Sequence, residues 1–195
     1  LKALVKDESV YLGDIDTRKI TDMSKLFFKS KRKDFSGIES WDTSNVKNMR
    51  AMFFGCSDFN QNISSWNVSN VVNMNQMFMW CNNFNQPLDA WDVSNVENME
   101  EMFSGCESFN QPLDAWDVSN VYDMNGMFFE CSNFNQNISN WNVSNVRYMN
   151  FMFCGCRSFN QPLDTWDVSN ACDMSFMLAD CYNFEQSLYE WKIPI

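Results

Sequence analysis

The chain has 195 residues, no histidine and a net charge of −11. The charge is unevenly placed, because residues 1–40 carry nine Lys or Arg and seven Asp or Glu, whereas residues 41–195 carry five and eighteen. An acidic array repels phosphate backbones, so nucleic acid is excluded as the main ligand. No apolar run reaches the roughly 18 residues of a membrane-spanning helix, and we expect no membrane insertion.

The N-terminal residues 1–14 stand outside any repeat. Leu1, Leu4 and Val5 occur at helical spacing, which predicts a short amphipathic cap over the first apolar layer of an array. The segment has neither an initiator Met nor the pattern of a signal peptide, so we expect a mature or trimmed fragment. The basic run that follows at residues 29–33 is expected to form a solvated loop.

A unit of 25 residues organises the rest of the chain. Residues 15–40 form a degenerate first copy, residues 41–190 form six full copies, and residues 191–195 are expected to form a terminal strand. A fixed period of this length indicates one continuous solenoid domain, in which each copy buries its apolar face against its neighbours. Tryptophan marks the copies at constant spacing, at Trp41, Trp66, Trp91, Trp116, Trp141, Trp166 and Trp191.

The pattern of apolar residues within each copy predicts one strand and one helix. Apolar residues alternate through the motif L-x-x-W-x-V at residues 113–118, which predicts a half-buried strand that pairs in parallel with its neighbours. The next apolar residues have spacings of three, three, one and three, which favours one face of a helix over residues 121–131. The fold class is therefore α/β. In the return at residues 134–136, the Asn and Gln amides are expected to satisfy loop backbone groups.

The whole unit, W-[DN]-V-S-N-V-x-[ND]-M-x-x-M-F-x-x-C-x-x-F-N-Q, resembles the repeat of the BspA-like leucine-rich-repeat surface proteins of bacteria and mycoplasmas. The resemblance covers residues 15–193. It implies a right-handed, leucine-rich-repeat-like α/β solenoid at the cell surface or secreted, often with a role in attachment to host proteins, and it supplies no catalytic residue. We therefore expect a non-catalytic protein-binding or adhesion module. The alternative is a structural spacer that has no ligand of its own.

Two repeated features are candidates for chemistry. The first is a ladder of one cysteine per copy, which fits buried free thiols better than a zinc site, because zinc sites need closely spaced pairs, often with His. The second is paired aspartates, for which a calcium site is the sharper alternative to a solvated acidic face. The calcium ligands would be Asp89, Asp92, Asp114 and Asp117. The aspartate pairs of successive copies are nearly identical, so none of them is distinguished as a catalytic acid–base pair. We therefore expect neither an enzyme nor a cofactor.

Positions that differ between copies are the candidates for partner binding. Stacking does not explain large apolar groups there, and contiguous exposed aromatics mark contact sites. Their alternative role is to fill gaps between adjacent helices. They predict a protein partner, host or extracellular, or self-association through this aromatic flank or the C-terminal edge. The candidate residues are Trp80, Tyr122, Phe129, Tyr148, Phe151 and Phe176.

Overall fold

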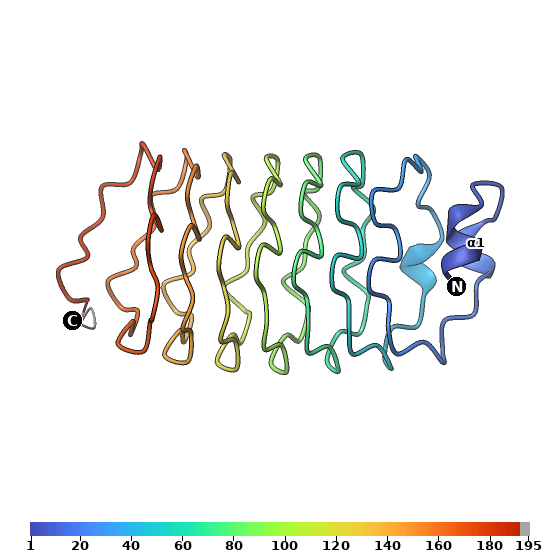
Figure 1. Cartoon of the computed structure of the whole chain (residues 1–195), viewed down its shortest axis with the longest axis horizontal. Coiled ribbons are helices and arrows are strands. Elements are labelled where there is room, and N and C mark those ends of the chain that lie inside the picture. The colour runs from blue at the N-terminus through green and yellow to red at the C-terminus, as the bar shows by residue number, and fades with distance from the viewer. Residues whose placement is uncertain (192–195) are drawn as a thin grey trace.

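The computed structural model describes residues 1–191, which wind into successive coils stacked along one axis, with the two ends of the chain at opposite ends of the stack (Figure 1). Each coil corresponds to one copy of the sequence repeat. Coil 1 comprises residues 15–40, and coils 2 to 7 comprise residues 41–65, 66–90, 91–115, 116–140, 141–165 and 166–190.

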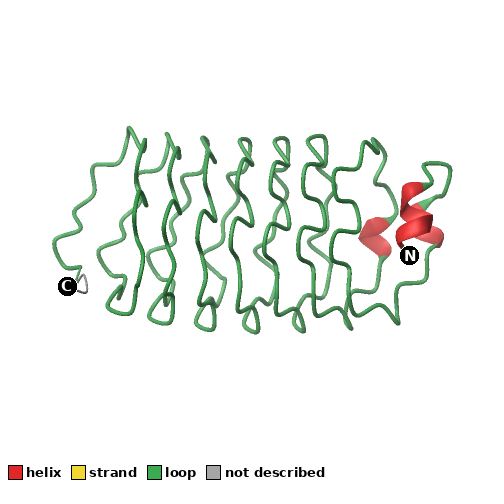
Figure 2. Ribbon diagram, in the orientation of Figure 1, coloured by secondary structure: helices red, strands yellow, loops and turns green. Residues whose placement is uncertain are grey.

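Regular secondary structure is sparse in residues 1–191. The helices there are α1 (Lys2–Lys6) and two short 3₁₀-helices, η1 (Leu12–Asp14) and η2 (Ile38–Ser40), and most of the trace is loop and turn (Figure 2). In place of strands, isolated parallel bridges join one residue of each coil to the next, as in the pairs Asn73–Asn98 and Asn98–Asp123. The expected right-handed, leucine-rich-repeat-like α/β solenoid of strand–helix repeats is therefore wrong.

The segment that was expected to be helical is a series of tight turns. In coil 4 the N–H of Met102 donates to the carbonyl of Met99 (3.1 Å), and the N–H of Cys106 donates to that of Phe103 (2.8 Å). The third residues of these turns, Glu101 and Gly105, have φ values of +52° and +72°, as in type II turns. The side chains of the first and fourth residues of each turn point into the core. Successive turns therefore give the same three-residue spacing of apolar residues as one face of a helix.

The backbone of this segment bonds to the next coil rather than to itself. Alternate N–H groups of coil 4 donate to carbonyls of coil 5 at 2.7 to 2.9 Å. The donors are Met99, Glu101, Phe103 and Gly105, and the acceptors are Asp123, Asn125, Met127 and Phe129. A straight α-helix would use these groups internally. Stacking therefore provides the hydrogen bonds that a helix would otherwise make within itself.

The predicted strand at the tryptophan is also absent, although the tryptophan is a core residue. Trp116 is 3% exposed, and its indole N–H donates at 2.9 Å to the carbonyl of Leu88, which is the equivalent of Leu113 one repeat earlier. Its own N–H closes a turn onto Leu113 (3.1 Å), which interrupts any extended pairing there. Each repeat tryptophan thus fastens successive layers of the stack to each other.

The core is a set of parallel columns of identical side chains. Phe103 is fully buried between Phe78 and Phe128, with ring centroids 5.6 and 5.7 Å away. Burying a side chain of this size contributes about 1.5–3 kcal/mol. The same contacts recur in every interior coil, so the free energy of folding comes from neighbouring coils together.

The Asn and Gln amides of the return behave as predicted. Asn85 Oδ1 accepts the backbone N–H of Asn110 (3.0 Å) and the side-chain N–H of Gln111 (3.0 Å) in the next coil. A second ladder runs through the Ser-Asn turns, where Asn120 donates its amide N–H to the carbonyl of Ser94 at 2.7 Å. In the Asn-Gln return and in the Ser-Asn turn, these side-chain hydrogen bonds therefore join neighbouring coils.

The N-terminal end of the stack is covered by the segment that carries α1. Val5 is buried, and Arg32 donates from its guanidinium to the carbonyls of Asp7 (3.1 Å) and Val10 (2.6 Å). The expectation of a solvated basic loop is therefore wrong for Arg32, which ties this segment to coil 1. The terminal strand expected at 191–195 lies outside the described residues from position 192 onward.

Candidate surface for partner binding

One surface of the stack carries the positions that differ most between coils. We call it the variable face: in coil 4 it is formed by residues 97–107, and in the other coils by the equivalent residues 21–31, 47–57, 72–82, 122–132, 147–157 and 172–182. Two positions per coil have positive φ, at Glu101 and Gly105 in coil 4 and at Gln76 and Trp80 in coil 3. The backbone there is held by bonds between coils, so non-glycine residues are kept in a conformation that they rarely adopt.

At the second of these positions, large residues alternate with glycine along the stack. Trp80 lies over Gly105, and a Cβ added to that glycine would be 2.2 Å from the indole. Glu130 lies over Gly155 in the same manner, with its Cα 3.3 Å from such a Cβ. Trp80 is half-buried. It therefore fills a gap between coils, which was the alternative role considered for the aromatic residues.

Three of the predicted aromatic residues form a row across coils 5 to 7. The ring centroids of Phe129 and Phe151 are 6.4 Å apart, edge to face, and those of Phe151 and Phe176 are 5.1 Å apart and stacked. Phe176 is 64% exposed, while Phe129 and Phe151 are half-buried. We call Phe129, Phe151 and Phe176 the aromatic row.

The two predicted tyrosines lie elsewhere on the variable face. Tyr122 and Tyr148 are 42% and 43% exposed, and their coils are joined by the bridge between Asp123 and Tyr148. The amide of Asn98 donates to the Tyr122 hydroxyl at 3.4 Å. Neither tyrosine forms a ring contact with the aromatic row among the described residues.

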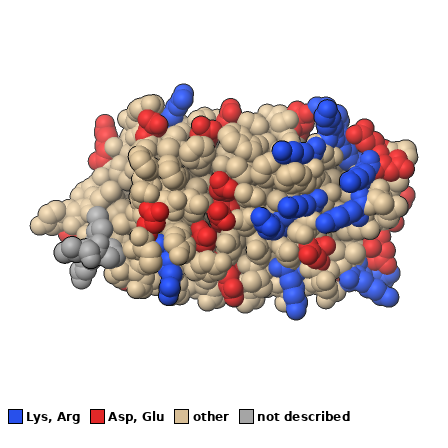
Figure 3. Space-filling view, in the orientation of Figure 1, with Lys and Arg blue, Asp and Glu red and all other residues tan. Residues whose placement is uncertain are grey.

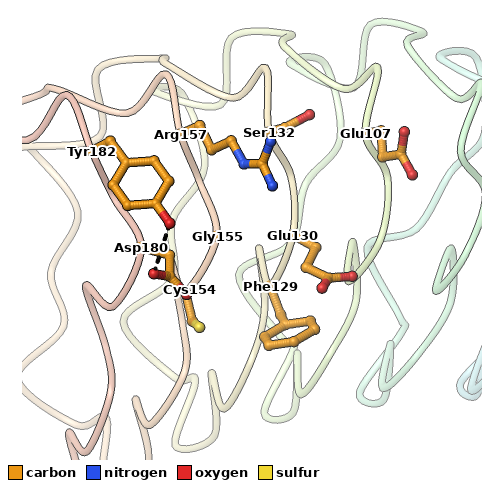
Figure 4. A pocket seen from close by; sticks show the side chains of 9 residues that line it. All are labelled: Glu107, Phe129, Glu130, Ser132, Cys154, Gly155, Arg157, Asp180 and Tyr182. Atoms are coloured by element: carbon orange, nitrogen blue, oxygen red, sulfur yellow. Dashed lines mark hydrogen bonds between the residues drawn. The ribbon is translucent and has the colours of Figure 1, made fainter.

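Two shallow depressions border the aromatic row. One, of about 420 Å³, is lined by residues that include Phe129, Glu130, Arg157 and Tyr182, and Figure 4 shows Tyr182 donating to Asp180 across its rim, at 3.0 Å. The other, of about 310 Å³, lies between Glu101, Phe129 and Phe151. Both present acidic side chains next to an aromatic ring.

Charge on the molecule is divided along the stack. On the side shown in Figure 3, most Lys and Arg lie toward the N-terminal end, where Asp and Glu are also present, and a group of Asp and Glu lies near the middle. A polar chain crosses the boundary on the variable face: Arg50 donates to Asn75 Oδ1 (3.1 Å), and Asn75 donates to Glu100. Partial burial, together with repulsion from Asp123 and Glu101, raises the pKa of Glu100.

Two of the four aspartates considered as calcium ligands accept hydrogen bonds from the turns that follow them. Asp92 Oδ1 accepts the N–H (3.1 Å) and hydroxyl (2.6 Å) of Ser94, and Asp117 Oδ1 accepts the N–H of Ser119 (3.0 Å). Asp89 and Asp114 are exposed. Within residues 1–191, no group of three or more Cys, Asp or Glu is arranged to hold a metal ion.

The cysteine ladder consists of free thiols. Cys106 Sγ donates to the carbonyl of Phe78 at 3.1 Å, and Cys131 Sγ donates to that of Phe103 at 2.9 Å. Burial raises the pKa of both thiols, and it raises that of Cys56 to about 12. A buried, protonated thiol is unreactive, so the ladder is part of the core.

Sequence reasoning missed the charged residues of the variable face. Lys47 and Arg50 occupy the same repeat positions as Glu97 and Glu100, two coils later. This reversal of charge at equivalent positions is the sequence signal that identifies them.

Residues 5–116 and 98–194 each match the family described as Mycoplasma protein of unknown function, DUF285. The chain therefore belongs to that family. No curated protein and no solved structure matches it. The helices within residues 1–191 are too short and too polar to cross a membrane.

Proposed function

We propose that the chain is a non-catalytic protein-binding module of a BspA-like bacterial surface protein, at the cell surface or secreted. The observation that carries the proposal is the aromatic row, in which Phe151 and Phe176 place large apolar rings at a position where other coils carry Lys25, Ala51 or Gln76. Stacking of coils does not require those rings. Exposed aromatic clusters of this kind are typical of contact sites.

The surroundings of the aromatic row favour a protein partner with basic groups. Glu101 and Glu130 lie at its edges, in the two depressions that share Phe129. A partner that inserts an apolar side chain between the rings would be flanked by carboxylates, which orient a Lys or Arg at the rim. A structural spacer would need neither feature.

The test is binding to host cells, with the double variant Phe151→Ser/Phe176→Ser. Fluorescently labelled wild type and variant are incubated with epithelial cells, and saturable binding is followed by flow cytometry. We expect the variant to lose at least tenfold in apparent affinity. Tyr189→Ser is the matched control, because Tyr189 is 90% exposed but lies outside the variable face.

The spacer alternative gives a different result in the same assay. If wild type shows no saturable binding, or if the double variant binds as wild type does while remaining folded, the aromatic row is not a binding site. Circular dichroism and the unfolding midpoint of each variant establish that it is folded.

A further inference from the structure

The charges of the variable face are segregated coil by coil. Coil 3 has no charged residue there. Coils 1 and 2, on one side of it, carry five basic residues and one acidic residue, whereas coils 4 and 5, on the other side, carry six acidic residues and no basic one. The first group is Lys25, Lys29, Lys31, Lys47, Arg50 and Asp22; the second is Glu97, Glu100, Glu101, Glu107, Asp123 and Glu130.

Opposite charges occupy equivalent repeat positions at equal distances from coil 3. Lys47 in coil 2 is matched by Glu97 in coil 4, and Arg50 in coil 2 by Glu100 in coil 4. In the outer coils, Lys29 in coil 1 is matched by Glu130 in coil 5, and these are the second positive-φ positions of their coils. Trp80 is the equivalent of the latter two residues in coil 3.

A two-fold axis that crosses coil 3 at right angles to the stack would bring these residues together. It places coil 2 of one copy against coil 4 of the other, and coil 1 against coil 5. Within each such pair of coils, a residue faces the residue at the same repeat position in the other copy. Every one of the three pairs then forms twice. A parallel arrangement would instead set like charges against each other, which is unfavourable.

We propose that the variable face binds a second copy of this chain in an antiparallel, two-fold symmetric dimer centred on Trp80. This interface is isologous, so it closes on itself and forms no filament. It goes beyond the proposed function, because it uses coils 1 to 5, whereas Phe176 in coil 7 lies outside the overlap. Phe129 and Glu130 in coil 5 lie within the overlap, so a dimer would cover that end of the aromatic row and display the end at Phe176 twice.

The structure holds the central charges in position before association. Arg50 and Glu100 both bind Asn75, so their side chains lie along the face rather than free in solvent. The partly exposed indole of Trp80 supplies an apolar centre, where aromatic residues contribute most to binding. One contact is unfavourable, because Asp22 would face Asp123.

The expected dimer is weak and depends on salt. Stacked chains lie about 4.8 Å apart, so the five coils span only roughly 20–25 Å, and the area that they can bury is correspondingly small. Its charged pairs are screened as ionic strength rises. Sedimentation equilibrium at low salt, over a wide range of concentration, is therefore the appropriate measurement.

The decisive experiment compares two charge reversals with their mixture. Arg50→Glu sets the introduced carboxylate against Glu100 twice, and Glu100→Arg sets the introduced guanidinium against Arg50 twice, so each variant alone should lose at least tenfold in dimer affinity. In an equimolar mixture, the heterodimer pairs the two introduced side chains with each other, and it pairs Glu100 of one chain with Arg50 of the other. The mixture should therefore recover wild-type association, as should the double variant.

The control is Arg18→Glu, which makes the same change of charge on an exposed residue outside the variable face, and which should dimerise as wild type does. Unfolding midpoints establish that each variant is folded. A wild-type chain that stays monomeric at low salt overturns the proposal. So do single reversals that dimerise normally, or a mixture that associates no better than its components.

Discussion

The indole of Trp80 lies directly over the backbone of Gly105 in the next coil, so that a Cβ on Gly105 would be 2.2 Å from Trp80 Cε3. Gly105 also has a φ of +72°. Two separate constraints, a conformational one and a steric one, therefore require glycine at this position.

Gly105→Ala should destabilise the protein by about 2–5 kcal/mol, of which about 1–2 kcal/mol comes from the left-handed backbone and about 1–3 kcal/mol from overpacking. Gly126→Ala is the control. Gly126 also has positive φ, but Ala51 occupies the equivalent position in coil 2, and an added Cβ comes no closer than 3.3 Å to Glu101 Cγ. Urea denaturation measures both, and equal losses of stability would show that the contact with Trp80 contributes nothing.

The buried hydrogen bond of each tryptophan gives a second prediction. Trp116→Phe keeps an aromatic ring in the core but leaves the carbonyl of Leu88 without the indole N–H, which now lies 2.9 Å away. An unsatisfied buried acceptor costs about 1–3 kcal/mol, so the urea midpoint should fall accordingly. An unchanged midpoint would mean that the indole bond does not fasten the coils.

The half-buried carboxylate of Asp123 gives a prediction about pH. Burial and repulsion from Glu101 raise its pKa in the folded chain. A raised carboxyl pKa favours the folded state below the unfolded pKa, and that contribution is lost as pH rises through the folded pKa. Asp123→Asn should therefore raise the unfolding midpoint at pH 7 but not at pH 3, where the wild-type carboxyl is protonated.

Asparagine is a suitable replacement there because Asn48, Asn73 and Asn98 occupy the equivalent positions, and Asn98 Oδ1 accepts the N–H of Glu100 as Asp123 Oδ1 accepts that of Asn125. The midpoints of wild type and variant are compared in urea at the two pH values. An equal gain at both would point to packing rather than to charge.

The thiols of the core predict a loss of stability in alkaline solution. Burial raises the pKa of Cys56 from 9.0 to about 12, so folding keeps this thiol protonated. Its contribution is complete below pH 9 and disappears as pH rises toward 12. The unfolding midpoint of Cys56→Ala should accordingly fall less between pH 8 and pH 11 than that of wild type. If the unfolding midpoints of the two proteins fall equally with pH, ionisation of Cys56 is not the cause of the loss of stability.

The 25-residue period allowed the inward residues of the interior copies to be predicted from the sequence, as Phe103 and Trp116 show. The local backbone could not be predicted in the same way. Met99, Met102, Phe103 and Cys106 have the spacing of a helix face, and only the bonds from Glu101 and Gly105 to the next coil distinguish turns from a helix. Those bonds join residues 24 positions apart, beyond any local pattern.

The candidate surface was predictable only in part. Phe129, Phe151 and Phe176 were identified because they vary between copies, and they do lie together. Trp80 has the same sequence signal but fills the space above a glycine. Distinguishing the two cases needs the neighbour in the next coil, which a pattern within one copy does not contain.

The variable face is built on a backbone of turns, and hydrogen exchange of single amides tests that backbone most directly. In coil 4, the N–H groups of Glu101 and Phe103 donate to backbone carbonyls of coil 5, whereas that of Glu100 donates to the side chain of Asn98. We expect strong protection at Glu101 and Phe103 and rapid exchange at Glu100, with the same alternation in coils 3 and 5. Uniform protection of consecutive amides through residues 99–105 would indicate a helix and would contradict the account.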